Sequence, residues 1–178
     1  MDPSQEPVIV VDDQDNEVAI LPRLEAEADE AKNIRMVYIL LIDDEGQILL
    51  QRRHGSLARF PNYWTVSASG AVYPKEGYVQ AAERKLFDEL GFTIPLFSAH
   101  KELLLVPKQA SRMTNIFVGK VKDIAVVKHN TSKISELRWV SIEDAEKGYL
   151  LTPSCAKVLK WWGEHGADVR KDVEAKYA

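Results

Sequence analysis

Cysteine is almost absent from this sequence of 178 residues, in which Cys155 stands alone. A single thiol excludes an internal disulfide framework. The longest apolar runs, such as residues 36–42, are far shorter than the ~20 residues of a membrane span, so no membrane partner is expected. The N-terminal residues contain no apolar signal core. Together these absences predict that the protein is located in the reducing cytoplasm.

An excess of basic charge is also absent. Lysine and arginine number 23 against 27 aspartates and glutamates, which gives a net charge of -4. This balance argues against polymeric nucleic acid as a partner, although a local basic site for a small phosphate is compatible with it. Hydrophobic residues make up 46% and charged residues 28%. We therefore expect one globular domain over residues 1–178.

Short β-rich runs separated by turn residues predict a series of strands. Residues 8–11 and 17–21, on either side of an Asp- and Asn-rich turn, predict an N-terminal hairpin within residues 8–22. Residues 25–32 read as a connector. The other expected strands are 36–42, 47–51, 64–72, 102–106, 113–121 and 136–140.

Helical periodicity marks three further segments. Val79, Ala82, Leu86 and Leu90 lie on one arc at ~100° per residue, and Gly91 stands where a C-terminal cap is expected. Ser141 and Thr152-Pro153 look like helix starts. The last helix places one apolar face toward the core through Cys155, Val158, Leu159 and Trp162. Strands mixed with helices predict an α/β domain, its sheet covered on both faces, with a core at 36–162 and a C-terminal tail at 163–178.

Charged residues gather on the helix that ends at Gly91. Lys85, Asp88 and Glu89 fall within an arc of roughly 100°, because positions three and four apart are neighbours on a helix. Acidic oxygens beside a glycine loop, whose backbone carbonyl could add another ligand, suit Mg²⁺ or Mn²⁺. Such an ion would neutralise a diphosphate. The alternative is a solvated helix face with Lys85 and Glu89 as an ordinary ion pair, and spacing alone does not decide.

The same segment resembles the signature of the Nudix hydrolases, G-x5-E-x7-R-E-U-x-E-E-x-G-U, where U is bulky and apolar. Asp88 conservatively replaces the first glutamate of the final pair, and Lys85 alone departs in chemistry. Correct spacing over the whole motif is far more specific than a short glycine motif. The matching residues are Gly70, Glu76, Arg84, Leu86, Glu89, Gly91 and Phe92.

The flanking residues indicate a branch of that family. Residues 49–53, 60–65 and 67–70 resemble the corresponding stretch of type 1 isopentenyl-diphosphate isomerases and of the hydrolases most similar to them. The resemblance implies the Nudix α/β/α sandwich with a mixed sheet, and the N-terminal hairpin fits the same branch. Residues after about 163 have no counterpart in it.

Isomerase activity is not expected. That reaction protonates and deprotonates a carbon skeleton, which the family does with a cysteine and a glutamate. Ser69 stands at the cysteine position and Ala71 at that of a metal-binding histidine, while Arg35 lies in the region of another such histidine. Strand 113–118 lacks the family's paired glutamates.

Hydrolysis of a phosphoanhydride by water needs less. The resemblance implies a divalent ion, Mg²⁺ or Mn²⁺, held by Gly70, Asp88 and Glu89. Glu76 and Arg84 would form a supporting ion pair. Lys85 replaces a glutamate that in this family ligates metal or orients the attacking water. We therefore count Lys85 with Asp88 and Glu89 as a catalytic position, with an ammonium where the family has a carboxylate. Lys133 likewise stands where many relatives carry an acidic residue.

Two arginines are candidates for holding substrate phosphate. Neighbouring strand residues point to opposite faces of a sheet, so at most one of Arg52 and Arg53 faces the site. Its place in the family resemblance favours Arg53 as the residue that binds phosphate. Arg59 is a second candidate. The alternative for both arginines is an exposed side chain that contacts solvent and binds no phosphate. The leading hypothesis is hydrolysis of a nucleoside di- or triphosphate or a related small diphosphate. The rival is a weakly active or inactive domain that binds a diphosphate metabolite or a protein, and a homodimer is compatible with either.

Overall fold

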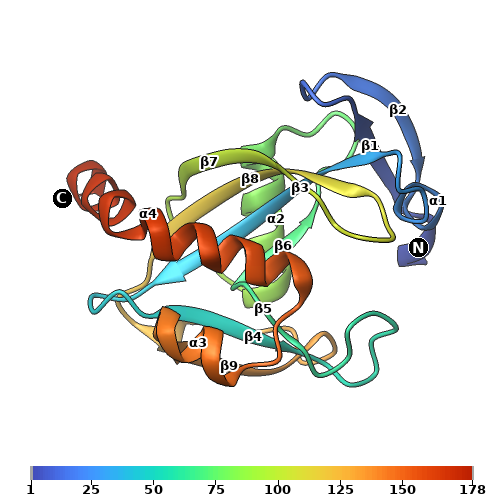
Figure 1. Ribbon diagram of the computed structural model, residues 1–178. Helices are drawn as coiled ribbons and strands as arrows, with labels where there is room; N and C mark the ends of the chain where they lie inside the picture. The colour runs from blue at the N-terminus through green and yellow to red at the C-terminus, as the bar shows by residue number, and fades with distance from the viewer. Residues whose placement is uncertain (1, 178) are drawn as a thin grey trace.

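The centre of the molecule is a long buried strand. The computed structural model describes residues 2–177 (Figure 1). Strand β3 (Asn33–Ile42) has ten residues, and it pairs in parallel with β8 (Ser111–Lys120) along its whole length. Its nearly continuous apolar run suits a strand that is covered on both faces.

The other edge of β3 is shared by three antiparallel partners. They are β1 (Pro7–Val11), β6 (Ala68–Ala71) and β4 (Ile48–Arg53). The remaining strands extend this arrangement into one mixed sheet of nine strands. Strand β2 (Glu17–Pro22) pairs with β1, and β7 (Phe97–Leu104) pairs with β8. Strands β5 (Trp64–Thr65) and β9 (Ile134–Val140) both pair with β4.

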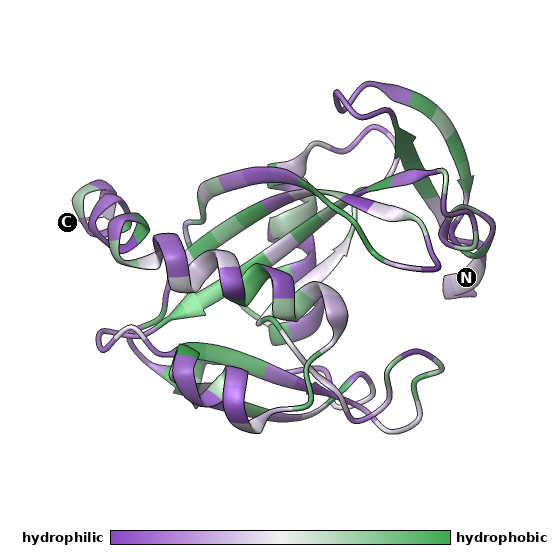
Figure 2. Ribbon diagram, viewed as in Figure 1, coloured by the Kyte–Doolittle hydropathy of each residue, from purple (hydrophilic) through white to green (hydrophobic). Residues whose placement is uncertain are grey.

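Helices cover both faces of the sheet, which confirms the predicted α/β/α sandwich. Helix α4 (Pro153–Tyr177) crosses one face and α2 (Tyr78–Leu90) lies behind the other (Figure 1). In Figure 2 hydrophobic residues are concentrated in the central strands between them, and α4 alternates between hydrophilic and hydrophobic residues. Alternate residues of β3 serve the two cores: Tyr38 and Leu40 belong to the cluster that contains α4 residues, and Val37 and Ile39 to the cluster with α2.

Shorter elements complete the chain. Helix α1 (Arg23–Glu27) follows the N-terminal hairpin of β1 and β2, which the sequence predicted, and α3 (Ile142–Gly148) begins at Ser141, whose hydroxyl accepts from the Asp144 N–H. Single 3₁₀ turns lie at Pro3–Gln5 and Ile124–Val126. Thr152 Oγ1 accepts from Cys155 N at 3.3 Å, so the expected cap of the last helix is present.

Several expected boundaries are wrong. The strand expected at 64–72 is two short strands, because Ser67 Oγ donates to the Leu49 carbonyl and accepts from Leu41 N, which bridges β4 and β3 at the break. The strand expected at 102–106 lies at 97–104. The connector expected at 25–32 begins inside α1. Val79, placed on the apolar arc of α2, is 54% exposed, and Ala81 is buried instead.

The C-terminal segment is not a separate tail. Up to Tyr177 it continues α4, and Val169 and Val173 are buried in the core cluster on that face of the sheet. Among residues 2–177, no helix combines the length and the apolarity that crossing a membrane requires.

Candidate active site

Glu89 is a buried carboxylate on α2. Leu86 and Leu90 fix the helix against the sheet, and Gly91 closes it in the left-handed conformation at φ 77°, which glycine adopts without strain. Glu89 is only 8% exposed. Its Oε2 accepts from Ser69 N at 3.1 Å and its Oε1 from Gln51 Nε2 at 3.3 Å. The carboxylate is therefore held in one orientation by β6 and β4.

Lys85 lies one turn before Glu89 and packs on the glycine loop. A Cβ added at Gly70 would stand 2.4 Å from Lys85 Cε, so a larger residue there would displace the lysine side chain from its present position. The Lys85 ammonium is 3.8 Å from Glu89 Oε2. A positive charge thus lies beside the buried carboxylate.

Asp88 does not converge with Glu89, contrary to the sequence interpretation. Its side chain is 50% exposed, and its nearest cationic partner is Arg84, with Nη1 3.9 Å from Oδ2. Consecutive helix residues are separated by ~100°, and burial of Glu89 turns Asp88 outward. Across residues 2–177, no three His, Cys, Asp or Glu side chains gather into a metal-binding group.

Arg84 and Glu76 form the ion pair expected from the motif. Arg84 Nε is 2.6 Å from Glu76 Oε1, and Nη2 is 3.0 Å from Oε2 and from the Ala71 carbonyl. Glu76 Oε2 also accepts from Tyr73 N at 2.8 Å. The guanidinium lies 3.8 Å from the centre of the Tyr73 ring. These contacts fasten the loop between β6 and α2 onto the helix.

The donors suit a single Mg²⁺ that arrives with its substrate. Mg²⁺ is commonly bound by one or two carboxylates, with waters and substrate phosphates completing its shell. Glu89 is prearranged to supply one carboxylate, and Asp88, which is half exposed and near Arg84, would have to reorient to supply a second. The arrangement does not fit an all-protein cage, because the third acidic position of the helix is Lys85.

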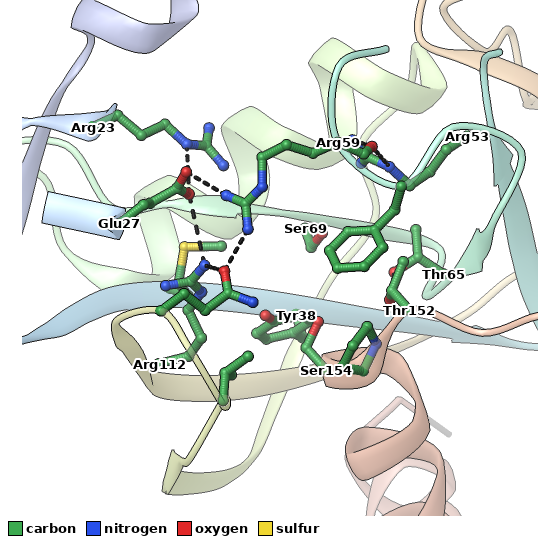
Figure 3. A pocket seen from close by; sticks show the side chains of 15 residues that line it. Arg23, Glu27, Tyr38, Arg53, Arg59, Thr65, Ser69, Arg112, Thr152 and Ser154 are labelled. Atoms are coloured by element: carbon green, nitrogen blue, oxygen red, sulfur yellow. Dashed lines mark hydrogen bonds and ion pairs between the residues drawn. The ribbon is translucent and has the colours of Figure 1, made fainter. Parts of the chain in front are cut away.

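Ser69, whose backbone N–H donates to Glu89, also lines a cavity that contains four arginines (Figure 3). Arg53 lies in its wall, whereas Arg52 points elsewhere and donates to the Asn62 carbonyl. Arg53 Nε and Nη2 donate to the Arg59 carbonyl at 3.0 and 2.8 Å, which holds loop 54–63 against β4. Arg59 in turn reaches Glu27 and Gln109. Both predicted arginines therefore line one cavity.

Burial perturbs several charges in this cavity. It lowers the pKa of Arg53 and of Arg112, although carboxylates oppose the shift. Burial also acts to raise the pKa of Glu27, but Arg23 and Arg59 outweigh it and hold that pKa below its usual value. Ionisable groups whose pKa values are shifted by burial inside a cavity are typical of functional sites.

Sequence reasoning missed half of this cavity. Arg23, Glu27 and Arg112 were not candidates, and Ser69, considered only as the replacement of the isomerase cysteine, lines the cavity. Arg23 and Glu27 are four residues apart in a segment read only as a connector. One signal was available: Arg112 adjoins the apolar run of β8, where a charge demands a partner.

Comparisons with known proteins agree with this architecture. The NUDIX domain family model matches residues 32–162. An uncharacterized Nudix hydrolase of Pseudomonas aeruginosa is 32% identical over a stretch that covers 84% of this chain and 87% of that protein. A prenyl-diphosphate phosphatase of Methanosarcina mazei is 28% identical over a stretch that covers 67% of this chain and 70% of that protein. The crystal structure of DR0079 from Deinococcus radiodurans superposes with a TM-score of 0.74 at 22% identity, covering 87% of this chain and 98% of that one. Isopentenyl-diphosphate isomerases also match, as the flanking residues predict.

Proposed function

The chain belongs to the Nudix family of hydrolases, and from this premise we propose that it cleaves the phosphoanhydride of a nucleoside di- or triphosphate or a related small diphosphate. One observation carries the proposal. The buried carboxylate of Glu89, held by Ser69 and Gln51, lies beside a cavity lined by arginines. A diphosphate needs that pairing of a metal-binding oxygen and guanidinium groups.

The roles proposed for the chain follow from its contacts. Glu89 and Asp88 would hold Mg²⁺ or Mn²⁺, with the Gly70 carbonyl as a further oxygen donor. When bound, such an ion screens the charge of the diphosphate and lowers the pKa of a bound water. Arg53 lines the cavity and donates through Nε and Nη2 to the Arg59 carbonyl, so its remaining N–H groups would bind a substrate phosphate. Arg84 and Glu76 act indirectly, by fixing the loop that follows β6, the strand in which Gly70 lies.

The test is phosphate release from a nucleotide panel with and without Mg²⁺, in the wild type and in Glu89→Gln. We expect metal-dependent release in the wild type and a loss of at least about a hundredfold in the variant, the scale of ~2.7 kcal/mol of barrier. Glu83→Gln on the exposed side of the same helix is the matched control and should retain full activity. Equal activity of the Glu89 variant and the control would refute the proposed role.

A second function is favoured by Lys85. Its ammonium stands 3.8 Å from Glu89 and competes with a divalent ion for the carboxylate. The corresponding proposal is a domain that binds a diphosphate metabolite or a partner protein without turning it over. Nucleotides that raise the melting temperature but are never hydrolysed, at any metal concentration, would support this second function over the first.

A further inference from the structure

The cavity beside Glu89 contains more positive charge than a diphosphate site beside a metal requires. Four arginines line it, contributed by α1, β4, loop 54–63 and β8, and Glu27 is the one acidic side chain among the lining residues (Figure 3). These arginines are Arg23, Arg53, Arg59 and Arg112. The Arg112 side chain is only 6% exposed, whereas those of Arg23 and Arg59 are 30% and 40% exposed and open to a ligand, so the surplus of positive charge suits an anion.

Glu27 occupies the centre of this cluster. Arg23 Nε is 3.0 Å from Oε1, Arg112 Nη2 is 3.7 Å from the same oxygen, and Arg59 pairs with Oε2. The Glu27 side chain is 11% exposed. A carboxylate offers about four lone-pair sites, whereas three guanidinium groups carry about fifteen N–H donors. Gln109 Oε1 accepts from Arg59 and Arg112, and the Ala110 carbonyl accepts from Arg112, so the N–H groups that remain are the capacity for another anion.

The position of the cluster separates it from the scissile diphosphate. Ser69 lies between the two places: its side chain lines the cavity, and its backbone N–H donates to Glu89 Oε2. A diphosphate held near Glu89 and Arg53 would direct the rest of its molecule toward Arg59 and Arg112. Hydroxyl groups of Thr65, Thr152 and Ser154 also line the cavity. A prenyl tail there would cover guanidinium groups without pairing them, which is unfavourable.

Resting on the proposed function, we infer that the substrate carries a second anionic group, a phosphate or a carboxylate, distant from its diphosphate, which binds Arg59 and Arg112 in place of the Glu27 carboxylate. Glu27 acts as an internal stand-in for that group. The exchange keeps the arginines paired in both states. The rearrangement falls on the side chains of Glu27, the last residue of the five-residue helix α1, and of Arg59, which lies in a loop.

Binding in the presence of EDTA tests the inference without turnover. Two matched ligand pairs differ by one anionic group: ADP against ADP with an extra 2′- or 3′-phosphate, and UDP-glucose against UDP-glucuronate. Isothermal titration should show at least about a tenfold preference for the more anionic member of one pair. Arg59→Ala should abolish that preference, and Arg52→Ala, outside the cavity, should retain it. Glu27→Gln should tighten the preferred ligand several-fold.

Three results would overturn the inference. They are no preference within either pair, a preference that survives Arg59→Ala in a variant that melts like the wild type, or tighter binding of geranyl diphosphate than of any anionic ligand. Because no metal is present, the outcome is independent of hydrolysis. An intact preference without any hydrolysis refutes only the proposed function, and metal-dependent hydrolysis without a preference refutes only the second anionic group.

Discussion

Adjacent residues of one helix have unlike environments at the candidate active site. Glu89 is buried and receives two hydrogen bonds, while Asp88 is half exposed and near Arg84. The helix turn separates them, and packing of Leu86 and Leu90 decides which one faces the sheet. Two neighbouring carboxylates are thus unequal, and the buried one carries the greater expected effect on activity.

Lys85 determines how strongly this site attracts a cation. Lys85→Glu should tighten Mn²⁺ binding, because it removes an ammonium 3.8 Å from Glu89 and adds an oxygen donor. If the rest of the machinery is competent, hydrolysis should rise by about one order of magnitude or more, which corresponds to ~1.4 kcal/mol of barrier. Mn²⁺ titration and turnover measure the two effects.

Lys85→Gln is the matched control for that prediction, since it removes the charge but keeps most of the stem that covers Gly70. Its Mn²⁺ affinity should lie between those of the wild type and Lys85→Glu. Weaker nucleotide binding in both variants would instead assign Lys85 to substrate phosphate. Unchanged metal affinity, nucleotide affinity and turnover would make it an ordinary surface residue.

At the scale of elements, α2 is tied to the N-terminal hairpin as well as to the sheet. Tyr78, the first residue of the helix, donates to Asp15 in the hairpin turn at 2.9 Å, and Arg35 of β3 reaches the same carboxylate at 2.8 Å. Burial and the bond to Asp15 raise the pKa of Tyr78. Arg35, which the resemblance placed at a histidine position, therefore serves the hairpin.

The packing of α2 gives a stability prediction with an internal control. Leu86→Ala should lower the free energy of unfolding by about 2–5 kcal/mol, because Leu86 is fully buried between helix and sheet. Val79→Ala in the same helix should change it by less than ~0.5 kcal/mol, since Val79 is 54% exposed. Chemical denaturation followed by circular dichroism measures both. Equal losses would contradict the orientation of the helix.

At the scale of the whole molecule, the two faces of the sheet belong to separate core clusters. The cluster with α4 includes residues from both ends of the chain, Val8 and Val173 among them. The other joins α2 to the opposite side of β3. Loss of either helix would expose one complete face of the sheet, so the domain is expected to unfold as one cooperative unit.

Cys155 reports on that cooperativity. It is fully buried, and burial raises the pKa of its thiol to about 12, so neither access nor thiolate is available in the folded state. Ellman's reagent should label the native protein at least about a thousandfold more slowly than the denatured one, as expected when unfolded molecules are rare. Denaturant should accelerate labelling in parallel with loss of circular dichroism. Rapid labelling of native protein would show that α4 opens independently.

The sequence by itself determined the layers of the fold and the position of the signature helix. Local patterns sufficed for these features: an apolar run for β3, helical periodicity before Gly91, and capping residues for α3 and α4. It also predicted the pairing of Arg84 with Glu76, because the motif fixes their spacing.

Only the tertiary structure decided which side chains meet. Asp88 and Glu89 share a helix arc, yet burial separates them. Glu27, Arg59 and Arg112 are remote in sequence and meet because α1, loop 54–63 and β8 border the same cavity. Periodicity reports contacts within an element, whereas contacts between elements depend on how the whole chain packs. The arginine-lined cavity is of the second kind, and no local pattern predicted it.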